Sequence, residues 1–453
     1  MKTILAAKES IAQLWGHPKP KDTVYRLMKY LLQVEVDDGT LLHNVVTGQL
    51  VLLTKEEAEV LSHLPAKLTG SMRELADNHF LVPEDFDEYR SVKQLRRILQ
   101  SRETGDAINH YIILPTTFCN AHCFYCYESD YPRVHMTEET ANKLIDYIDA
   151  HRKDKDVLLS WFGGEPLVGM ERIDQISQGL KDRGIPFKAS MISNGYLFDE
   201  EVVERSANLW NLKRVQITLD GTEEVYNQVK AYAGVKDNPF QRVLRNIDLL
   251  RNKGIQVNIR INVDFYNKDN IRELIAELGK KYSGQEKISI YLNILFNDQG
   301  FDPVHHSQED IIELAGVVDD YSELLSGFKV ANSRQKIPYL KANQCMADND
   351  HSVEVQPDGS FTRCEHESIL DSYGNLDDGI LDPQKPLEWK ETIERSDYCP
   401  ECVMYPCCFV LKNCMSAEQS CIEGFRSREQ VRCKELLRSV YHQKLEVGKN
   451  ESL

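Results

Sequence analysis

The sequence predicts an α/β protein whose centre is an open, partial (β/α)6 barrel of the TIM-like kind, and two observations support this fold class. Between about residue 107 and residue 325, β-branched stretches alternate with amphipathic helical patterns, as in a parallel sheet with helices between its strands. Six such units are too few to close an eight-stranded barrel, so we expect the sheet to stay open. The expected strands are 110–117, 156–162, 187–193, 214–220, 255–264 and 288–296, and the clearest helices are 137–152, 199–210, 240–254 and 270–282.

Residues 1–105 predict a separate small α+β module before the barrel. A strand-like stretch over 30–54 is interrupted by Asp38-Gly39 and Thr47-Gly48, which are typical turn pairs, so it indicates a β-meander. Helical patterns follow at 55–65 and 91–102. The simplest interpretation of such a module is an appendage that packs on the rest of the chain.

The composition excludes several classes of protein. The chain has 453 residues, 42% of them apolar, and no apolar run that could span a membrane. Its first residues lack the apolar stretch of a signal peptide, so we expect a cytoplasmic protein. In that reducing compartment, twelve cysteines indicate metal binding or catalysis more than disulfides. A net charge of −17 argues against nucleic acid as a partner.

Three cysteines lie close together directly after the first expected strand. Cys119, Cys123 and Cys126 form a C-x3-C-x2-C pattern. Thiolates in such numbers favour zinc or an iron–sulfur cluster. A structural zinc site normally has four protein ligands, so three thiolates leave one coordination position for another molecule. The alternative is a zinc site completed by His122 or by a distant ligand.

Polar motifs follow the later strands in the same way. They are "WFGGEP" at 161–166, "SNG" at 193–195, "LDG" at 219–221 and "RIN" at 260–262. Groups that follow successive parallel strands converge at one end of a barrel. Each motif alone is weak evidence, but their order after the cysteine triplet is specific.

In this order, the motifs of residues 107–433 resemble those of radical S-adenosylmethionine (SAM) enzymes. The resemblance implies that Cys119, Cys123 and Cys126 hold a [4Fe–4S] cluster with one iron left open for SAM. An electron from the cluster would cleave SAM to methionine and a 5′-deoxyadenosyl radical, which abstracts hydrogen from the substrate. An external donor such as flavodoxin or ferredoxin would supply the electron.

The resemblance also implies which residues contact SAM. Gly163, Gly164 and Glu165 match the segment that binds its amino group. Ser193 matches a position near the ribose or the carboxylate.

Three more residues are expected near SAM on the same ground. Tyr125 lies where the family has an aromatic side chain over the adenine. Asp220 is expected at the strand end that faces the cofactor, and Arg260 could neutralise the SAM carboxylate. For Asp220 and Arg260, a hydrogen bond or ion pair that only stabilises the fold is an equal alternative.

The other nine cysteines lie between residues 345 and 433, in a region (326–453) that resembles a SPASM domain with two auxiliary [4Fe–4S] clusters. Five residues separate Cys408 from Cys414, where the family has three. The zinc-only alternative applies to this region too. The matching residues are Cys345, Gly359 and Cys364 for C-x9–15-G-x4-C, Cys399, Cys402 and Cys408 for C-x2-C-x5-C, and a final Cys433.

The resemblance divides these cysteines into two ligand sets. The first lacks a fourth member unless Cys421 completes it, and otherwise one iron is open to a substrate thiolate. Cys407 is left over and is expected to be a small buried residue. The first set is Cys345, Cys364 and Cys414, and the second is Cys399, Cys402, Cys408 and Cys433.

The same resemblance suggests a substrate class. SPASM enzymes mostly modify peptides, and residues 1–105 are similar to the winged-helix-like module that binds the leader of ribosomal precursor peptides (the RiPP recognition element) as an added edge strand. Sulfatase-maturing members carry an aspartate base at the place of Glu365, which is therefore a candidate proton acceptor or else a surface carboxylate.

The leading hypothesis is a peptide maturase that installs a cross-link, in the first place a cysteine thioether of the sactipeptide or ranthipeptide kind. The alternatives are an anaerobic sulfatase-maturing enzyme that makes formylglycine, a maturase that joins two carbons, and an iron–sulfur protein that only transfers electrons.

Overall fold

The computed structural model describes residues 1–16, 23–70, 72–102, 105, 107–295, 307–332, 336–408, 410–414 and 423–450. The chain separates into two compact units. The barrel unit comprises Gly105–Arg334 and Cys345–Glu391, and the terminal unit comprises Met1–Thr104, Gln335–Gln344 and Thr392–Leu453. Residues 326–453, expected as one cysteine-rich domain, are thus distributed over both units, and the domain assignment stays a prediction.

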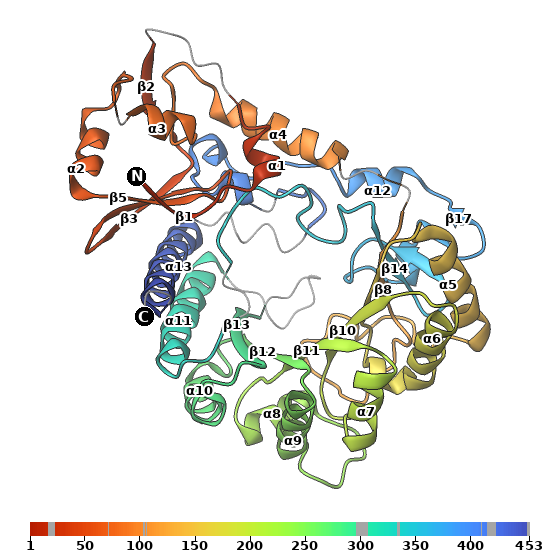
Figure 1. Cartoon of the computed structure of the whole chain (residues 1–453). Coiled ribbons are helices and arrows are strands. Elements are labelled where there is room, and N and C mark those ends of the chain that lie inside the picture. Colours follow the sequence, from red (N-terminus) through yellow and green to blue (C-terminus); the bar gives the residue numbers. More distant parts are fainter. Residues whose placement is uncertain are drawn as a thin grey trace. The chain divides into compact units, whose positions relative to one another are not determined.

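In the described part of the barrel unit, six consecutive parallel strands, β8 to β13, alternate with helices, which confirms the expected fold class (Figure 1). The strands, neighbours in chain order, are β8 (His110–Ile113), β9 (Val157–Trp161), β10 (Phe187–Ser193), β11 (Leu212–Thr218), β12 (Gln256–Val263) and β13 (Ile288–Ile294). The helices are α5 (Glu138–His151), α6 (Met170–Asp182), α7 (Glu200–Asn208), α8 (Glu223–Lys230), α9 (Pro239–Asn252), α10 (Lys268–Tyr282) and α11 (Gln308–Gly327), with a 3-10 turn η2 (Pro166–Gly169) before α6.

A hairpin extends this sheet beyond β8. Strand β14 (Ser352–Val355) runs parallel to β8, and β15 (Ser360–Thr362), β16 (Gly374–Asn375) and β17 (Gly379–Ile380) follow antiparallel. Strands β14 and β15 pair antiparallel as a hairpin. The short helices η3 (Ile369–Asp371) and α12 (Gln384–Glu388) complete the unit.

The two faces of the barrel strands differ in polarity. Figure 1 draws the helices on the outer side of the strands, and side chains of alternate residues such as Leu159 and Met191 are buried. Three of the intervening residues are polar and lie side by side: His110 Nε2 lies 3.0 Å from Ser160 Oγ, which lies 3.2 Å from Ser190 Oγ. The alternation has the period of two that a strand imposes, and it places this polar row on the face opposite the buried residues.

The terminal unit contains two antiparallel sheets and several helices. The larger sheet has the order β1 (Lys2–Leu5), β5 (Leu50–Leu53), β4 (Gly39–Asn44) and β3 (Leu31–Val36), and the smaller one has the order β6 (Ala66–Lys67), β2 (Val24–Leu27) and β7 (Leu81–Pro83). The helices are α1 (Glu9–Ala12), α2 (Lys55–Ala58), η1 (Glu59–His63), α3 (Met72–Asp77), α4 (Glu88–Arg102), η4 (Cys399–Glu401), η5 (Tyr405–Cys407) and α13 (Glu423–Asn450).

Both ends of the chain contribute to the core of the terminal unit. Strands β3, β4 and β5 are the meander expected at 30–54, and their buried residues include Leu41 and Leu42. The same hydrophobic cluster contains Leu437 and Tyr441 of α13. The hydroxyl of Tyr441 donates to Asp38 Oδ2 at 2.6 Å, in the turn between β3 and β4. Helix α13 therefore packs on the sheet of the first residues.

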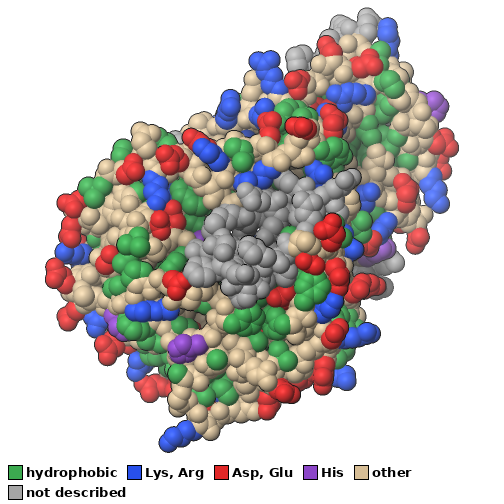
Figure 2. Space-filling model, turned by 180° about the vertical axis from the view of Figure 1, so that it is seen from behind, with side chains coloured by type: hydrophobic (Ala, Val, Ile, Leu, Met, Phe, Trp, Pro, Cys, Tyr) green, Lys and Arg blue, Asp and Glu red, His purple; other side chains and the backbone are tan. Residues whose placement is uncertain are grey.

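The surface mixes charges of both signs. On the face that Figure 2 displays, acidic and basic side chains alternate without a broad basic area. Within the described ranges, no helix is both long enough and apolar enough to cross a bilayer.

Candidate functional site

The three clustered cysteines lie on the loop that follows β8, at the carboxyl end of the parallel sheet. All three side chains are half-buried. The segment after α8 holds the loop through two backbone hydrogen bonds: His122 N–H donates to the Lys230 carbonyl at 2.8 Å, and Ala233 N–H donates to the Asn120 carbonyl at 3.3 Å. The position at a strand end, expected from the sequence, is the one in which this architecture gathers functional groups.

Backbone N–H groups point at the sulfur atoms of this loop. Ala121 N–H donates to Cys119 Sγ at 3.4 Å, and Glu128 N–H donates to Cys126. Such bonds favour the thiolate, which is the form that binds metal. Burial opposes them and raises the pKa of Cys119 to about 12 and that of Cys126 to about 11. A soft cation that replaces the protons would relieve this cost, so the donor set fits an iron–sulfur cluster.

Among the described residues, no three His, Cys, Asp or Glu side chains converge as ligands of a single metal ion. The side chain of His122, the alternative fourth ligand, is exposed. Cluster thiolates bind different iron atoms and need no such convergence.

The two glycines of "WFGGEP" allow two backbones to approach each other. Gly163 has φ +108°, and a Cβ at this residue would lie 2.4 Å from the carbonyl oxygen of Thr116. A Cβ at Gly164 would lie 2.5 Å from the carbonyl oxygen of Phe118. The close partner is therefore the cysteine loop itself. Contact of either glycine with SAM stays a prediction.

Glu165 is completely buried beside the same loop. Its carboxyl accepts hydrogen bonds from Ser193 Oγ at 2.9 Å, from Asn194 N–H at 2.8 Å and from Leu167 N–H at 3.2 Å. Burial raises its pKa to about 7, against these donors. The Ser193 hydroxyl thus donates its hydrogen bond to Glu165, and its expected position near the ribose or carboxylate of SAM stays a prediction.

Asp220 and Tyr125 belong to one buried network of hydrogen bonds. The cation of this network, Lys230, lies outside the motifs noted in the sequence. Lys230, at the end of α8, has a 5% exposed side chain and places Nζ 2.9 Å from Asp220 Oδ2, while Asp220 is fully buried. Tyr125 Oη donates to the same Asp220 oxygen at 2.8 Å, and Asn262 Nδ2 donates to the other at 2.9 Å. Burial lowers the pKa of Lys230, but neighbouring negative charges, chiefly Asp220, more than offset this effect.

Arg260 is connected to Asp220 only through Asn262. Its half-buried guanidinium donates from Nε to Asn262 Oδ1 at 2.8 Å, and Asn262 in turn contacts Asp220. The geometry matches the alternative in which Asp220 and Arg260 stabilise the fold. Their contact with SAM stays a prediction.

The sequence prediction does not include two residues that contact the cysteine loop. Lys230 looks like an ordinary cation in the last turn of a helix, and no local pattern reveals its buried partners. Asn194 belongs to the noted "SNG" motif, and its Nδ2 donates to Asn120 Oδ1 at 2.7 Å in the cysteine loop.

The loop of Cys364 packs directly on the loop of Cys126. The ring of Tyr127 lies 4.4 Å from that of His366, and Tyr131 Oη donates to the His366 carbonyl at 2.7 Å. Here too, backbone N–H groups point at sulfur: His366 donates to Cys364, and Ala347 donates to Cys345 at 3.3 Å.

Three carboxyl groups gather at this contact. Burial raises the pKa of Glu128 to about 7 and raises that of Glu354 on β14 well above its ordinary value, and the charge of Glu365 adds to both shifts. Glu128 Oε1 and Glu354 Oε2 accept no hydrogen bond from the described residues. Glu365, the candidate base, therefore lies among acidic neighbours close to both cysteine loops.

The remaining cysteines divide between the two units. Cys345 and Cys364 belong to the barrel unit and Cys414 to the terminal unit, and Cys421 lies outside the described residues. Cys407, expected to be a small buried residue, is half-buried, and its thiol donates to the Met404 carbonyl at 3.3 Å. Cys399, Cys402 and Cys433 are buried in the core of the terminal unit, with Cys407 and Cys408 packed against it.

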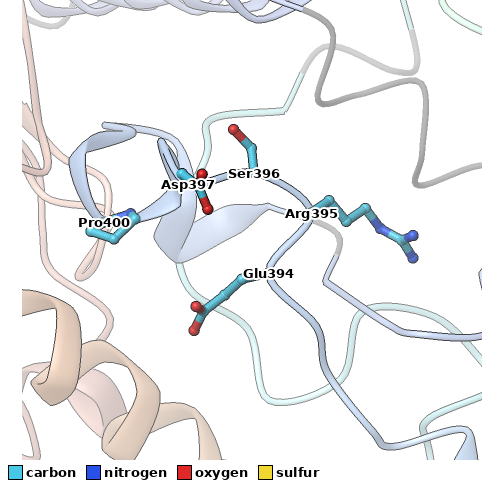
Figure 3. Close-up of a pocket in the computed structure, with 5 residues that line it drawn as sticks. All are labelled: Glu394, Arg395, Ser396, Asp397 and Pro400. Atoms are coloured by element: carbon cyan, nitrogen blue, oxygen red, sulfur yellow. The ribbon is translucent and has the colours of Figure 1, made fainter.

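A polar hollow in the terminal unit contains none of the expected site residues. It lies on the segment before Cys402 and is lined by Glu394, Arg395, Ser396, Asp397 and Pro400 (Figure 3).

Comparison with known proteins identifies the barrel. The profile of the Radical SAM superfamily matches residues 113–278, which include the cysteine loop, Glu165, Asp220 and Lys230. The chain carries a radical SAM domain. This domain implies a [4Fe–4S] cluster and SAM, and homologues that carry it are enzymes.

The relatives of this radical SAM domain differ in reaction. The chain is 29% identical over 319 residues to GTP 3′,8-cyclase of Clostridium perfringens, covering 65% of the chain and 91% of the relative. It is 20% identical over 433 residues to the radical SAM cyclopropyl synthase TigE of Paramaledivibacter caminithermalis, covering 84% and 88%. A serine-type anaerobic sulfatase-maturating enzyme of Bacteroides thetaiotaomicron matches at 28% over 163 residues, 33% of the chain and 38% of the relative.

Two solved structures resemble the chain in fold over three quarters of its length or more. Native anSMEcpe with bound AdoMet gives a TM-score of 0.55 at 15% identity and covers 75% of the chain and 99% of its own length. Streptococcus suis SuiB bound to S-adenosylmethionine gives 0.52 at 13% identity and covers 84% and 94%. At such identities the likeness concerns the fold.

Proposed function

We propose that the protein is a radical SAM maturase of ribosomally synthesised precursor peptides and that it installs a cysteine thioether. The observation that carries this proposal is the contact of the Cys126 and Cys364 loops through Tyr127 and His366. A second group of cysteines beside the first would hold a substrate sulfur next to the carbon radical, which supports formation of a sulfur–carbon bond. The match to TigE along 84% of the chain supports a relative of the maturase type.

The chain's own residues fit the cofactors of this reaction. Cys119, Cys123 and Cys126 would hold the cluster, and SAM when bound supplies the radical that abstracts hydrogen from the substrate. Three hydrogen bonds hold the Glu165 carboxylate in place, and it would accept a hydrogen bond from the SAM amino group. The auxiliary clusters would occupy the two cysteine sets expected from the sequence, and the first of them would accept the electron that is released when the carbon–sulfur bond forms.

Glu365 would act as the base that takes a proton from the substrate. It directly follows Cys364 and shares its surroundings with Glu128 and Glu354. The contact between the two cysteine loops supports a role of this carboxyl in catalysis over that of a solvated surface charge.

The leader of the precursor would bind along β1 of the terminal unit. An added strand needs a free sheet edge. Strand β3, at one edge of the larger sheet, contacts α13, and the side chains of Lys2 and Thr3 on β1, at the other edge, are exposed. Deletion of residues 1–104 would expose the shared core with α13, so a point substitution is the better test.

Thr3→Pro should weaken leader binding, because proline removes a main-chain N–H from the edge. Thr3→Ala is the matched control, since it changes only the side chain. Calorimetric titration of the anaerobic full-length protein with a synthetic leader peptide from a neighbouring gene would measure both. Equal affinity for the two variants would contradict binding at β1.

The reaction itself is tested by coexpression with that precursor. A thioether removes two hydrogen atoms, retains sulfur and protects the cysteine from alkylation by iodoacetamide, all visible by mass spectrometry. Reconstituted protein should also convert SAM to 5′-deoxyadenosine under a strong reductant. A peptide with a newly formed carbon–carbon bond and an alkylatable cysteine would contradict the thioether.

The second candidate is a sulfatase-maturing activity, favoured by the match to the Bacteroides enzyme and by the acidic residue after Cys364. A sulfatase peptide in which one cysteine or serine becomes formylglycine would establish it. A protein that binds iron and sulfide but never cleaves SAM would be an electron carrier.

A further inference from the structure

Lys230 contacts the cysteine loop with both its backbone and its side chain. Its carbonyl accepts the N–H of His122 at 2.8 Å. Its Nζ lies 3.1 Å from Tyr125 Oη, and Tyr125 is between the second and third cysteines of the loop. Because the first contact uses only the backbone, the loop keeps this anchor when the side chain is changed.

The groups that face the Lys230 ammonium come from three elements. Asp220 follows β11 and lies 2.9 Å away, Cys123 and Tyr125 belong to the cysteine loop, and Tyr226 is on α8. In such a buried place charges are weakly screened, so each acts strongly on its neighbours. The positive charge of the Lys230 ammonium and the negative charge of the Asp220 carboxylate therefore have opposite electrostatic effects on the cysteine loop.

We propose that Lys230 and Asp220 form a pair of opposite charges that sets the reduction potential of the [4Fe–4S] cluster held by Cys119, Cys123 and Cys126. Reduction adds one electron, and thus one negative charge, to the cluster and changes no covalent bond. The ammonium stabilises the reduced state and the carboxylate stabilises the oxidised state. Both residues would influence the reaction only through their electrostatic effect on the cluster. The inference deepens the proposed function, since it rests on a cluster bound by this loop.

A purely structural pair would give different results. If Lys230 and Asp220 only held Tyr125 in place, loss of either would loosen the loop in the same way. If they set the potential, loss of one must shift it in the direction opposite to loss of the other. The sign of the shift therefore separates the two roles.

The experiment is a dithionite titration of the anaerobic, reconstituted full-length protein, followed by electron paramagnetic resonance without SAM. The relevant signal is the one that disappears when Cys119, Cys123 and Cys126 are replaced by Ala. We expect Lys230→Met to lower the equilibrium constant for reduction by about tenfold, a shift of about 59 mV to more negative potential for one electron. Asp220→Asn should shift it to more positive potential.

Three further variants complete the test. The double variant Lys230→Met/Asp220→Asn should return close to the wild-type potential, and Lys230→Arg should retain it. Lys281→Met is the matched control, because Lys281 forms a pair with Asp248 at 2.8 Å whose members are 37% and 30% exposed, where solvent screens the charge.

Equal potentials in wild type, Lys230→Met and Asp220→Asn would overturn the inference, and so would shifts of the same sign. If Lys230→Met lost its iron, the other two variants would still test the inference. Asp220→Asn must shift the potential to more positive values, and Lys230→Arg must keep the wild-type potential. Failure of the cluster assignment is distinguishable, because the signal would then survive the replacement of the three cysteines.

Discussion

Replacing Gly164 with alanine should disturb the cysteine loop through a steric conflict that no side-chain rotation relieves. The new Cβ would lie 2.5 Å from the carbonyl oxygen of Phe118 and 2.6 Å from that of Thr117. Carbon–oxygen contacts normally begin near ~3.3 Å, so the two backbones must separate by about 0.8 Å. Overpacking of this kind costs about 1–3 kcal/mol in the free energy of unfolding.

The same displacement should lower the rate of SAM cleavage. The carbonyl of Phe118 directly precedes Cys119, and a misplacement approaching 1 Å can cost about 10²-fold in rate. Urea unfolding and the release of 5′-deoxyadenosine by reconstituted protein would measure the two effects. Gly327→Ala is the matched control, because no atom lies within 4 Å of its added Cβ and the residue ends helix α11. Wild-type stability and wild-type cleavage in Gly164→Ala would refute the reasoning.

Three further predictions concern single side chains. Burial raises the pKa of Glu165 to about 7, and the SAM ammonium should bind its ionised carboxylate in preference to the neutral acid. The affinity for SAM should therefore fall about tenfold for each pH unit below 7. Calorimetric titrations of Glu165→Gln should show no such pH dependence. Glu365→Gln should slow peptide modification while SAM cleavage continues; unchanged modification would exclude it as the base. Cys407→Ala should retain the iron content of the wild type and Cys408→Ala should lose iron, because the Cys407 thiol donates a hydrogen bond to a carbonyl; iron loss in both would make Cys407 a ligand.

The sequence predicts the barrel and the place of the site because both depend on local patterns. Apolar residues alternate in the strands with the period that the sheet requires, and Cys119 to Cys126 directly follow the first strand. The motif "GGEP" is recognisable from the sequence as well. Its glycines face the backbone of Thr116 and Phe118, and that contact between two loops has no local signal.

The contacts that organise the site are formed between residues distant in sequence. Lys230 and Tyr125 are 105 residues apart, and Tyr131 and His366 are 235 residues apart. A lysine at the end of an amphipathic helix normally lies in solvent, so its type and position predict exposure. Glu354 likewise occupies a strand position that looks solvated, whereas its side chain is completely buried. Only the assembled fold reveals these partners.

The core shared by the first strands and α13 has a consequence for biosynthesis. Leu41 and Leu42 leave the ribosome almost 400 residues before Leu437 and Tyr441, which belong to the same cluster. The apolar surface of the first strands therefore stays exposed until α13 has been synthesised, and such surface is prone to aggregate. Truncated chains from incomplete translation should consequently be targets for chaperones and proteases.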